Sequence, residues 1–203
     1  MPMMEKRPEK EEVAWILDYL PMGHTDIKQH GYQKKPLVQA VGEKQFTLMD
    51  IYIEEEISPE TREKIDLKGD KILQIRRISY KNLTNGSQKE LPHVIEKIVR
   101  KDEERFIDFF NTAYPLTTRL HMLELLPGIG KKLMWAVIEE REKGKFKSFQ
   151  ELVERVKGLH MPERLIAHRI EEELKDDNIK YRVFTTLPRH AREKETPIRH
   201  KRH

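Results

Sequence analysis

Short apolar stretches separated by turn residues dominate the first half of the chain. Five of these stretches predict β-strands, and they cover residues 13–19, 36–41, 45–54, 71–80 and 93–99. Gly42-Glu43-Lys44 predicts a hairpin between the second and third, and Asn85-Gly86 predicts a turn before the fifth. Ser58-Pro59 has the form of a capped helix start and predicts a short helix to about Ile65. Five strands with one helix between the third and fourth are the order of an OB-fold, so residues 13–100 are predicted to form an OB-fold-like β-barrel.

Helical patterns replace the strand pattern after residue 100. Asp102 is a candidate cap for a connecting helix over residues 101–114, whose packing side is marked by Phe106, Ile107, Phe109 and Phe110. Tyr114-Pro115 ends this helix, and further helices are predicted from near Leu116 onward. The predicted fold class is therefore α+β, with a small OB-like barrel followed by an all-α domain over residues 115–180. Residues 1–12 are charged and lack periodicity, which predicts a disordered N-terminus.

The segment Leu126-Pro127-Gly128-Ile129-Gly130-Lys131-Lys132 carries the most specific chemistry in the chain. Proline ends the preceding helix, and the two glycines permit the backbone angles of a tight reversal between helices. The second helix then starts with exposed N–H groups and two lysines. Such a start is positively polarised and suits a phosphate group, so the N–H groups of Gly128, Ile129 and Gly130 are predicted to hold a backbone phosphate.

This segment resembles the helix-hairpin-helix motif of DNA- and RNA-associated proteins. Leu123, Val137 and Arg141 stand where the motif has aliphatic residues and an arginine, whereas Met134 replaces a small alanine. The continuation over residues 141–152 is similar to that of competence-type hairpin domains. Hairpin turns of this kind sometimes recruit a potassium or sodium ion on their carbonyls, and here those of Leu126, Gly128 and Ile129 would hold it.

A second turn, Val156-Lys157-Gly158-Leu159-His160, resembles the first about thirty residues later. His160 replaces the second glycine, and the helical stretch 164–174 follows. The resemblance implies a tandem helix-hairpin-helix domain in which the first turn contacts phosphate and the second is mainly scaffold. An ordinary αα-turn without a ligand is the alternative interpretation of both turns.

Composition excludes several classes of function. The 203 residues contain no cysteine, which excludes disulfides, thiolate metal sites and cysteine nucleophiles. No apolar run approaches the ~18 residues of a membrane span, and the N-terminus has no signal-peptide pattern, so a soluble cytoplasmic protein is expected. The histidines are dispersed without metal-ligand spacing, and the acidic residues Glu171-Glu172-Glu173 with Asp176-Asp177 are interpreted as a solvated helix end.

Positive charge is concentrated at the C-terminus. The net charge of the chain is +4, but residues 181–203 carry seven basic residues against Glu193 and Glu195. These basic residues are Arg182, Arg189, Arg192, Lys194, Arg199, Lys201 and Arg202. We interpret residues 181–203 as a basic tail that follows a phosphate backbone, with a merely solubilising terminus as the alternative.

The OB-like half supplies a second set of candidate contacts. OB-folds bind oligonucleotides on the face of strands 2 and 3, through aromatic and basic side chains. The candidates are Tyr32, Lys34, Lys35, Lys44, Phe46, Tyr52, Arg76 and Arg77. Lys34, Lys35 and Arg77 are favoured, because aromatic residues in strands are more often part of the core.

The order of a strand-rich half, a hairpin domain and a basic tail resembles an archaeal family of uncharacterised, predicted RNA- or nucleic-acid-binding proteins. The resemblance covers residues 13–187 and implies binding without catalysis, with structured RNA favoured over the duplex DNA backbone. The expected nucleic-acid-binding residues are Gly128, Ile129, Gly130, Lys131, Lys132, Arg141, Lys34, Lys35, Arg77, Arg189 and Arg192. No membrane partner and no cofactor beyond the monovalent ion is expected.

Two alternatives remain open at this point. One is a protein-interaction adaptor associated with the ribosome or with the replication and repair machinery. The other is a DNA glycosylase, since Lys132 stands where the catalytic lysine of hairpin-containing glycosylases lies. The downstream aspartate of those enzymes is replaced here by Gln150, which leaves Lys132 without a matched acid–base partner.

Overall fold

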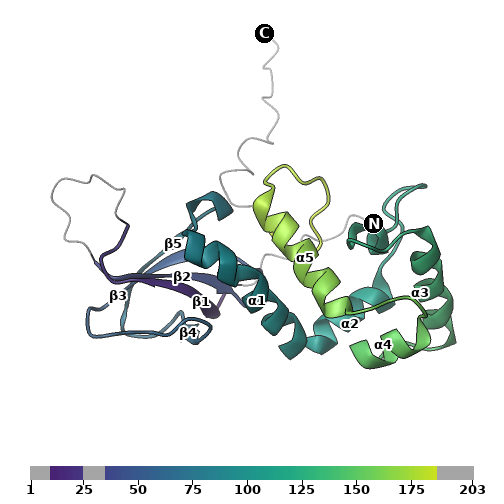
Figure 1. The fold of residues 1–203 in the computed structure, drawn as a ribbon, viewed down its shortest axis with the longest axis horizontal. Helices are drawn as coiled ribbons and strands as arrows, with labels where there is room; N and C mark the ends of the chain where they lie inside the picture. The colour runs from purple at the N-terminus through teal and green to yellow at the C-terminus, as the bar shows by residue number, and fades with distance from the viewer. Residues whose placement is uncertain (1–9, 25–34, 187–203) are drawn as a thin grey trace, which may run out of the picture. The chain divides into compact units, whose positions relative to one another are not determined.

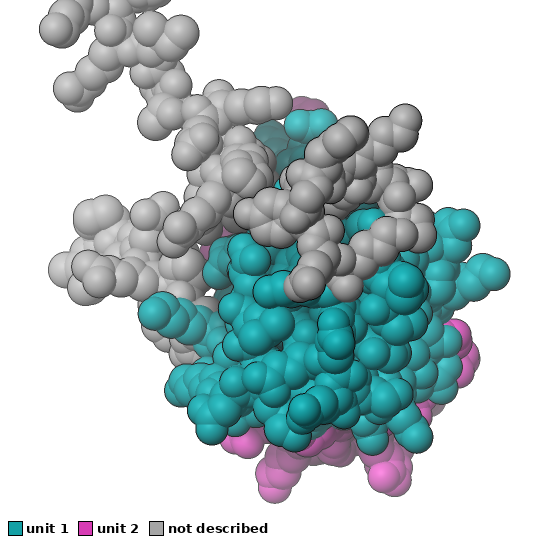
Figure 2. Space-filling view, turned by 90° about the vertical axis from the view of Figure 1, so that its left-hand side faces the viewer, with its two compact units in different colours: residues 1–91, 173–203 teal, residues 92–172 magenta. Residues whose placement is uncertain are grey.

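The computed structural model describes residues 10–24 and 35–186 (Figure 1). The chain divides into two compact units, which Figure 2 distinguishes by colour. Unit 1 comprises residues 1–91 and 173–203, and unit 2 comprises residues 92–172. The division passes through two helices, α1 (Asn85–Lys101) and α5 (Pro162–Lys175).

Unit 1 contains a curled five-stranded antiparallel sheet (Figure 1). Its strands are β1 (Val13–Leu20), β2 (Leu37–Gly42), β3 (Leu48–Ile53), β4 (Lys64–Asp66) and β5 (Ile72–Arg77). They are ordered β4-β1-β2-β3-β5. The core on one face consists of Ala14, Ile16, Val38, Ala40, Met49, Ile51 and Ile53. Four of the five predicted strands are confirmed as β1, β2, β3 and β5. Alternate side chains of β1, β2 and β3 enter this core, and β5 contributes the partly buried Ile72.

The fifth predicted strand is wrong, because residues 93–99 lie within α1. The apolar positions Leu91, Val94, Ile95, Ile98 and Val99 follow the helical spacing, and all five are fully buried. Asn85-Gly86 begins this helix instead of forming a turn. Thr84 caps it by accepting the Ser87 N–H at 3.0 Å, and its hydroxyl donates to the Asp18 carboxylate at 2.6 Å.

The predicted helix at residues 59–65 is also wrong. Residues 61–62 form a turn, with Arg62 at a φ of +67°, and lead into β4, which pairs with β1. The Arg62 N–H donates to the Ile16 carbonyl at 2.7 Å. Arg62 also makes a two-pronged contact with the Glu90 carboxylate, at 2.6 and 3.2 Å. Pairing along β1 therefore outweighs the local helix-start signal, and the described chain between β3 and β4 contains no helix.

Residues 181–186 belong to the folded part of unit 1, although we expected the tail to begin at Tyr181. They are held by Glu173, which is fully buried and not part of a solvated helix end. Its carboxylate accepts the N–H groups of Val183, Phe184 and Thr185 at 2.8–3.1 Å, together with the Thr185 hydroxyl at 2.9 Å. Arg182 closes the loop by donating to the Glu173 and Asp176 carbonyls.

Unit 2 is helical beyond the end of α1. Its elements are α2 (Glu103–Thr112), a 3₁₀ turn at η2 (Met122–Leu125), α3 (Lys131–Lys143), α4 (Phe149–Arg155) and the main part of α5. α2 confirms a helix within the predicted range 101–114, with Phe106, Ile107, Phe109 and Phe110 buried. It lies inside unit 2, however, and the links to unit 1 pass through α1 and α5. None of the helices in the described ranges is both long and apolar enough to cross a membrane.

The helix expected from near Leu116 does not form. The N–H groups of Leu116 and Thr117 donate to the Leu120 carbonyl, and the Thr117 hydroxyl accepts the N–H groups of Arg119 and Leu120. These local bonds compete with a helix and produce a tight loop. Between α2 and the glycine-rich turn, a segment that the structure describes in full, the only helical element is the 3₁₀ turn η2.

Candidate nucleic-acid interface

The first glycine-rich turn joins η2 to α3 with a fixed backbone. The Ile129 N–H donates to the Leu126 carbonyl at 3.1 Å, which closes the turn. Gly128 has a φ of +89°, a conformation that favours glycine, whereas Gly130 is extended. Leu126 and Ile129 are buried, and both glycines are exposed. Two apolar anchors therefore hold the turn and leave its glycine backbone open to solvent.

Gly130 is the N-cap of α3 and has no side chain to offer to the helix start. The first N–H groups of α3, those of Lys131, Lys132 and Leu133, have no carbonyl one turn earlier within the helix to receive them. The first turn of α3 also contains no acidic residue. The positive end of the helix is thus exposed without a capping group or a carboxylate of its own.

The two lysines after Gly130 have different surroundings. The Lys131 ammonium lies 2.8 Å from the Glu124 carboxylate and donates to the Arg119 carbonyl at 2.7 Å. The hydrogen bond from the Lys131 ammonium is the larger cause that lowers the pKa of Glu124, and the hydrogen bond from the His121 N–H is the next. Lys132 is exposed, and the structure places no carboxylate from residues 10–24 or 35–186 within 4 Å of its ammonium. Lys132 is therefore the more available cation of the pair.

His121 fixes the approach to the turn. Its Nδ1 accepts the Leu123 N–H at 3.1 Å, and its own N–H donates to the Glu124 carboxylate at 2.9 Å. The ring must be unprotonated at Nδ1 to accept this bond. Burial and then the nearby Arg141 charge lower the pKa of His121. The neutral imidazole is thus the form that this cap requires.

We expect unit 2 to lose stability as pH falls from about 7.5 to 5, because the unfolded chain takes up a proton that folded His121 resists. Because the pKa of His121 is lowered in the folded protein, its contribution to stability is fully present above the ordinary histidine pKa. The contribution is lost as pH falls from there through the lowered pKa. Loss of the cap should cost about 1 kcal/mol. Urea unfolding of wild type and His121→Asn at both pH values measures the difference. An equal pH dependence in both proteins would contradict the assignment to His121.

The second turn repeats the backbone of the first. The Leu159 N–H donates to the Val156 carbonyl at 3.2 Å, and Gly158 has a φ of +91°. Each turn glycine faces a leucine near the start of the other helix. A Cβ on Gly128 would lie 4.0 Å from the Leu165 side chain, and one on Gly158 would lie 3.6 Å from the Leu133 side chain. The two turns and their helices therefore form one reciprocal packing arrangement.

The two helices that follow the turns, α3 and α5, begin with chemically different residues. α5 begins with Pro162, which has no N–H, and its first turn contains Glu163, whose carboxylate pairs with Arg100 at 3.1 Å. α3 begins with two lysines and keeps all of its N–H groups. Only the first turn thus combines an open helix start with positive charge.

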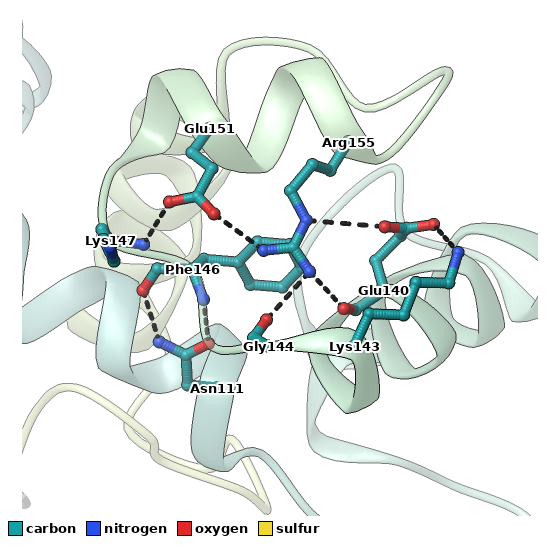
Figure 3. A network of polar contacts seen from close by, with 8 residues as sticks. All are labelled: Asn111, Glu140, Lys143, Gly144, Phe146, Lys147, Glu151 and Arg155. Carbon is teal, nitrogen blue, oxygen red and sulfur yellow. Dashed lines mark hydrogen bonds and ion pairs between the residues drawn. The ribbon is translucent and has the colours of Figure 1, made fainter.

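A polar network around Arg155 fixes the connection between α3 and α4 (Figure 3). Its guanidinium donates to the carbonyls of Glu140 and Gly144 at the end of α3, contacts the Glu151 carboxylate at 2.8 Å and lies over the Phe146 ring. Asn111 exchanges two hydrogen bonds with the Phe146 backbone, at 2.8 and 2.9 Å. The network gives hydrogen-bond donors to the carbonyls of Glu140 and Gly144, so it holds the end of the helix remote from the turn.

Several predicted contacts have other roles. The Ile129 N–H is used inside the turn, so its predicted bond to phosphate is not supported. Arg141 donates to the carbonyls of Phe110 and Ala113 at 3.1 and 2.8 Å, and it therefore caps the end of α2. Leu126, one of the predicted cation ligands, already accepts the Ile129 N–H on its carbonyl oxygen. The turn therefore brings together Gly128, Gly130, Lys131 and Lys132 from the predicted set.

The predicted contacts in unit 1 are separated along the sheet. Lys35 is exposed just before β2, whose first residue pairs with Tyr52, whereas Arg77 is exposed at the other end of β3, opposite Met49. Phe46 is fully buried and belongs to the core. Lys34, Arg189 and Arg192 lie outside the described residues.

Trp135 was not predicted as a functional residue. It lies on α3, one turn after Lys131 and Lys132, and its side chain is 57% exposed. The sequence alone gives no reason to expect an exposed tryptophan in this helix, since most large aromatic residues are buried.

These features define a mixed α+β protein with an open antiparallel sheet and a helical unit that presents paired glycine turns. The chain matches the model of the family described as "Protein of unknown function (DUF655)" over residues 10–186, and it belongs to that family. It is 46% identical to the uncharacterized protein MJ0038 of Methanocaldococcus jannaschii over 186 residues, which cover 89% of this chain and 82% of that protein. The crystal structure of Af1531 from Archaeoglobus fulgidus, assigned to the same family, has a TM-score of 0.80 at 46% identity and covers 87% of this chain and 100% of that one.

Proposed function

We propose that this chain is a non-catalytic nucleic-acid-binding protein that holds a backbone phosphate at the start of α3, with RNA favoured over DNA. The difference between the two turns carries this proposal. They share one backbone geometry, but only the first presents an uncapped helix start followed by two lysines. A phosphate oxygen would accept N–H groups from Gly130, Lys131 and Lys132, and the Lys132 ammonium would add charge.

In this proposal unit 2 is a tandem helix-hairpin-helix domain. Its second turn is scaffold, since Gly158 supports Leu133 at the start of α3 and α5 opens with a proline and an acid. Unit 1 is a relative of the OB-fold, because pairing of β4 with β5 would close its sheet into a five-stranded barrel. Contacts of α3 to phosphate would position the protein without reading base sequence.

Salt dependence tests the proposal. Replacing Lys132 by alanine should lower the slope of log affinity against log salt by about 0.7–0.9, because one phosphate contact releases about that many counterions. Fluorescence anisotropy with labelled single-stranded RNA, duplex RNA and duplex DNA at several salt concentrations measures this slope.

Lys157→Ala is the matched control, since Lys157 is the exposed lysine of the second turn. It should leave the slope unchanged. Equal slopes for wild type and Lys132→Ala would contradict a phosphate contact at the first turn. Absence of binding to all three nucleic acids at low salt would favour the adaptor function instead.

A further inference from the structure

The exposed face of α3 carries a lone aromatic side chain between opposite charges. Lys131, Lys132, Trp135, Glu139 and Glu142 are all exposed, whereas Met134 and Val137 on the other side of the helix are buried. Residues three and four apart are neighbours on a helix surface, so the indole of Trp135 stands next to both lysines. The two tryptophans of the chain differ sharply, since Trp15 is only 4% exposed and Trp135 is 57% exposed.

An indole that stays in water loses the large favourable free energy of burying an aromatic side chain, and Trp135 is not part of the core of unit 2. A tryptophan side chain offers a flat apolar face to a partner, and the ring nitrogen remains able to donate a hydrogen bond. The position of this residue therefore indicates a partner with a flat surface of its own.

The distribution of charge along α3 indicates which chemical groups a partner can place on this face. The end of the face near Gly130 carries Lys131 and Lys132 and is positive. Towards the other end Glu139 and Glu142 are exposed, and the charge of Lys143 is paired with the Glu140 carboxylate. A phosphate is attracted to the two lysines and repelled by the exposed Glu139 and Glu142, so the face favours a phosphate at its first end. A nucleotide held at the lysines would have its base near Trp135.

We propose that Trp135 stacks on an unpaired base next to the phosphate held at the start of α3. This inference rests on the proposed function and names its ligand class, which is single-stranded or looped nucleic acid. Paired bases inside a continuous duplex hide their faces in the stack, whereas unpaired bases can stack on aromatic side chains. The lysines hold any nucleic acid, and Trp135 distinguishes a strand with free bases from a closed duplex.

The test compares two RNAs of equal length and phosphate content, a single strand and a blunt duplex. Trp135→Ala should weaken binding of the single strand about tenfold, the effect expected for loss of one stacked base. It should change duplex binding less than about twofold, because Lys132 is retained. Trp135→Phe should keep most of the affinity for the single strand, because the phenyl ring can still stack.

Fluorescence gives an independent measurement. The difference in emission between wild type and Trp135→Phe isolates the Trp135 signal, since both proteins retain Trp15. Single-stranded RNA should quench this difference signal, and the blunt duplex should leave it nearly unchanged. Circular dichroism should show unaltered folding of both variants, because the side chain is exposed.

The possible failures are distinguishable. If Lys132→Ala lowers the salt slope but Trp135→Ala leaves single-strand affinity unchanged, the stacking inference is overturned and the phosphate contact stands. Equal losses for single strand and duplex would also overturn it, since the indole would then contact the backbone and not a base. If neither RNA binds and the Trp135 signal does not respond, the proposed function and the inference fail together.

Discussion

Replacing Gly130 with aspartate is expected to abolish phosphate binding at the first turn while stabilising α3. Gly130 is the N-cap of α3, with φ −89° and ψ −179°, which is the backbone conformation that capping residues adopt. A Cβ added there meets no atom within 4 Å. The new carboxylate would accept the N–H groups of Lys132 or Leu133, and those groups would no longer be available to a phosphate.

The two effects of Gly130→Asp have opposite signs. Capping and a favourable charge at the helix start should raise the unfolding free energy by about 0.5–1 kcal/mol. The same negative charge should repel phosphate and weaken nucleic-acid binding at least about tenfold at low salt. A variant that merely damaged the fold would lower both quantities. Thermal unfolding and anisotropy with the same RNA measure the two effects on one protein sample.

Three further variants separate the causes. Gly130→Ala adds neither a cap nor a charge and should retain most of the affinity, since its Cβ has open space. Gly130→Asn supplies a neutral cap, so its affinity should lie between those of the alanine and aspartate variants. Gly128→Ala is unsuitable as a test because a φ of +89° strains any side chain there. A stable Gly130→Asp variant with wild-type affinity would contradict phosphate binding at this helix start.

The turn itself could be predicted because its determinants are local. Proline, the two glycines and the lysines act within seven residues, and the structure places the turn and the start of α3 where these residues indicate. The partner of Lys131 could not be predicted in the same way. Glu124 lies seven residues earlier and reaches the ammonium only because the turn reverses the chain.

The fold prediction failed where an apolar run fits both the spacing of a strand and the spacing of a helix. Residues 93–99 contain apolar pairs that fit a short strand when viewed alone. Extending the window to Leu91 reveals the helical spacing that the structure confirms. The helix predicted at residues 59–65 failed for a different reason, because pairing of β4 with β1 depends on contacts distant in the sequence.

Burial of single residues was the least predictable property. Glu173 follows two other glutamates, and a run of acids at a helix end is usually solvated. Its burial depends on the loop over residues 181–186, which supplies the N–H donors. The exposure of Trp135 could not be predicted from the sequence either, because the position of a residue in a helix does not tell which side of α3 is covered.

Replacing Glu173 with glutamine is expected to release the loop over residues 181–186. The carboxylate accepts three N–H groups and one hydroxyl, and the glutamate residue is fully buried. Glutamine keeps one acceptor oxygen but replaces the other with an NH₂ donor, which must face at least one N–H donor of the loop. Each buried donor left unpaired costs about 1–3 kcal/mol, so the local stability of the loop should fall by about 3 kcal/mol.

Amide hydrogen exchange measures this loss directly. The amides of Val183, Phe184 and Thr185 should exchange about 100-fold faster in Glu173→Gln than in wild type, since 3 kcal/mol corresponds to about that factor. Glu172→Gln is the matched control, because the Glu172 side chain is 41% exposed and has a single ion pair with Arg169 at 3.6 Å. That variant should change stability by less than about 1 kcal/mol. If the three amides keep their protection in Glu173→Gln, the carboxylate does not hold the loop, and the Arg182 contacts to the carbonyls of Glu173 and Asp176 must be sufficient to do so.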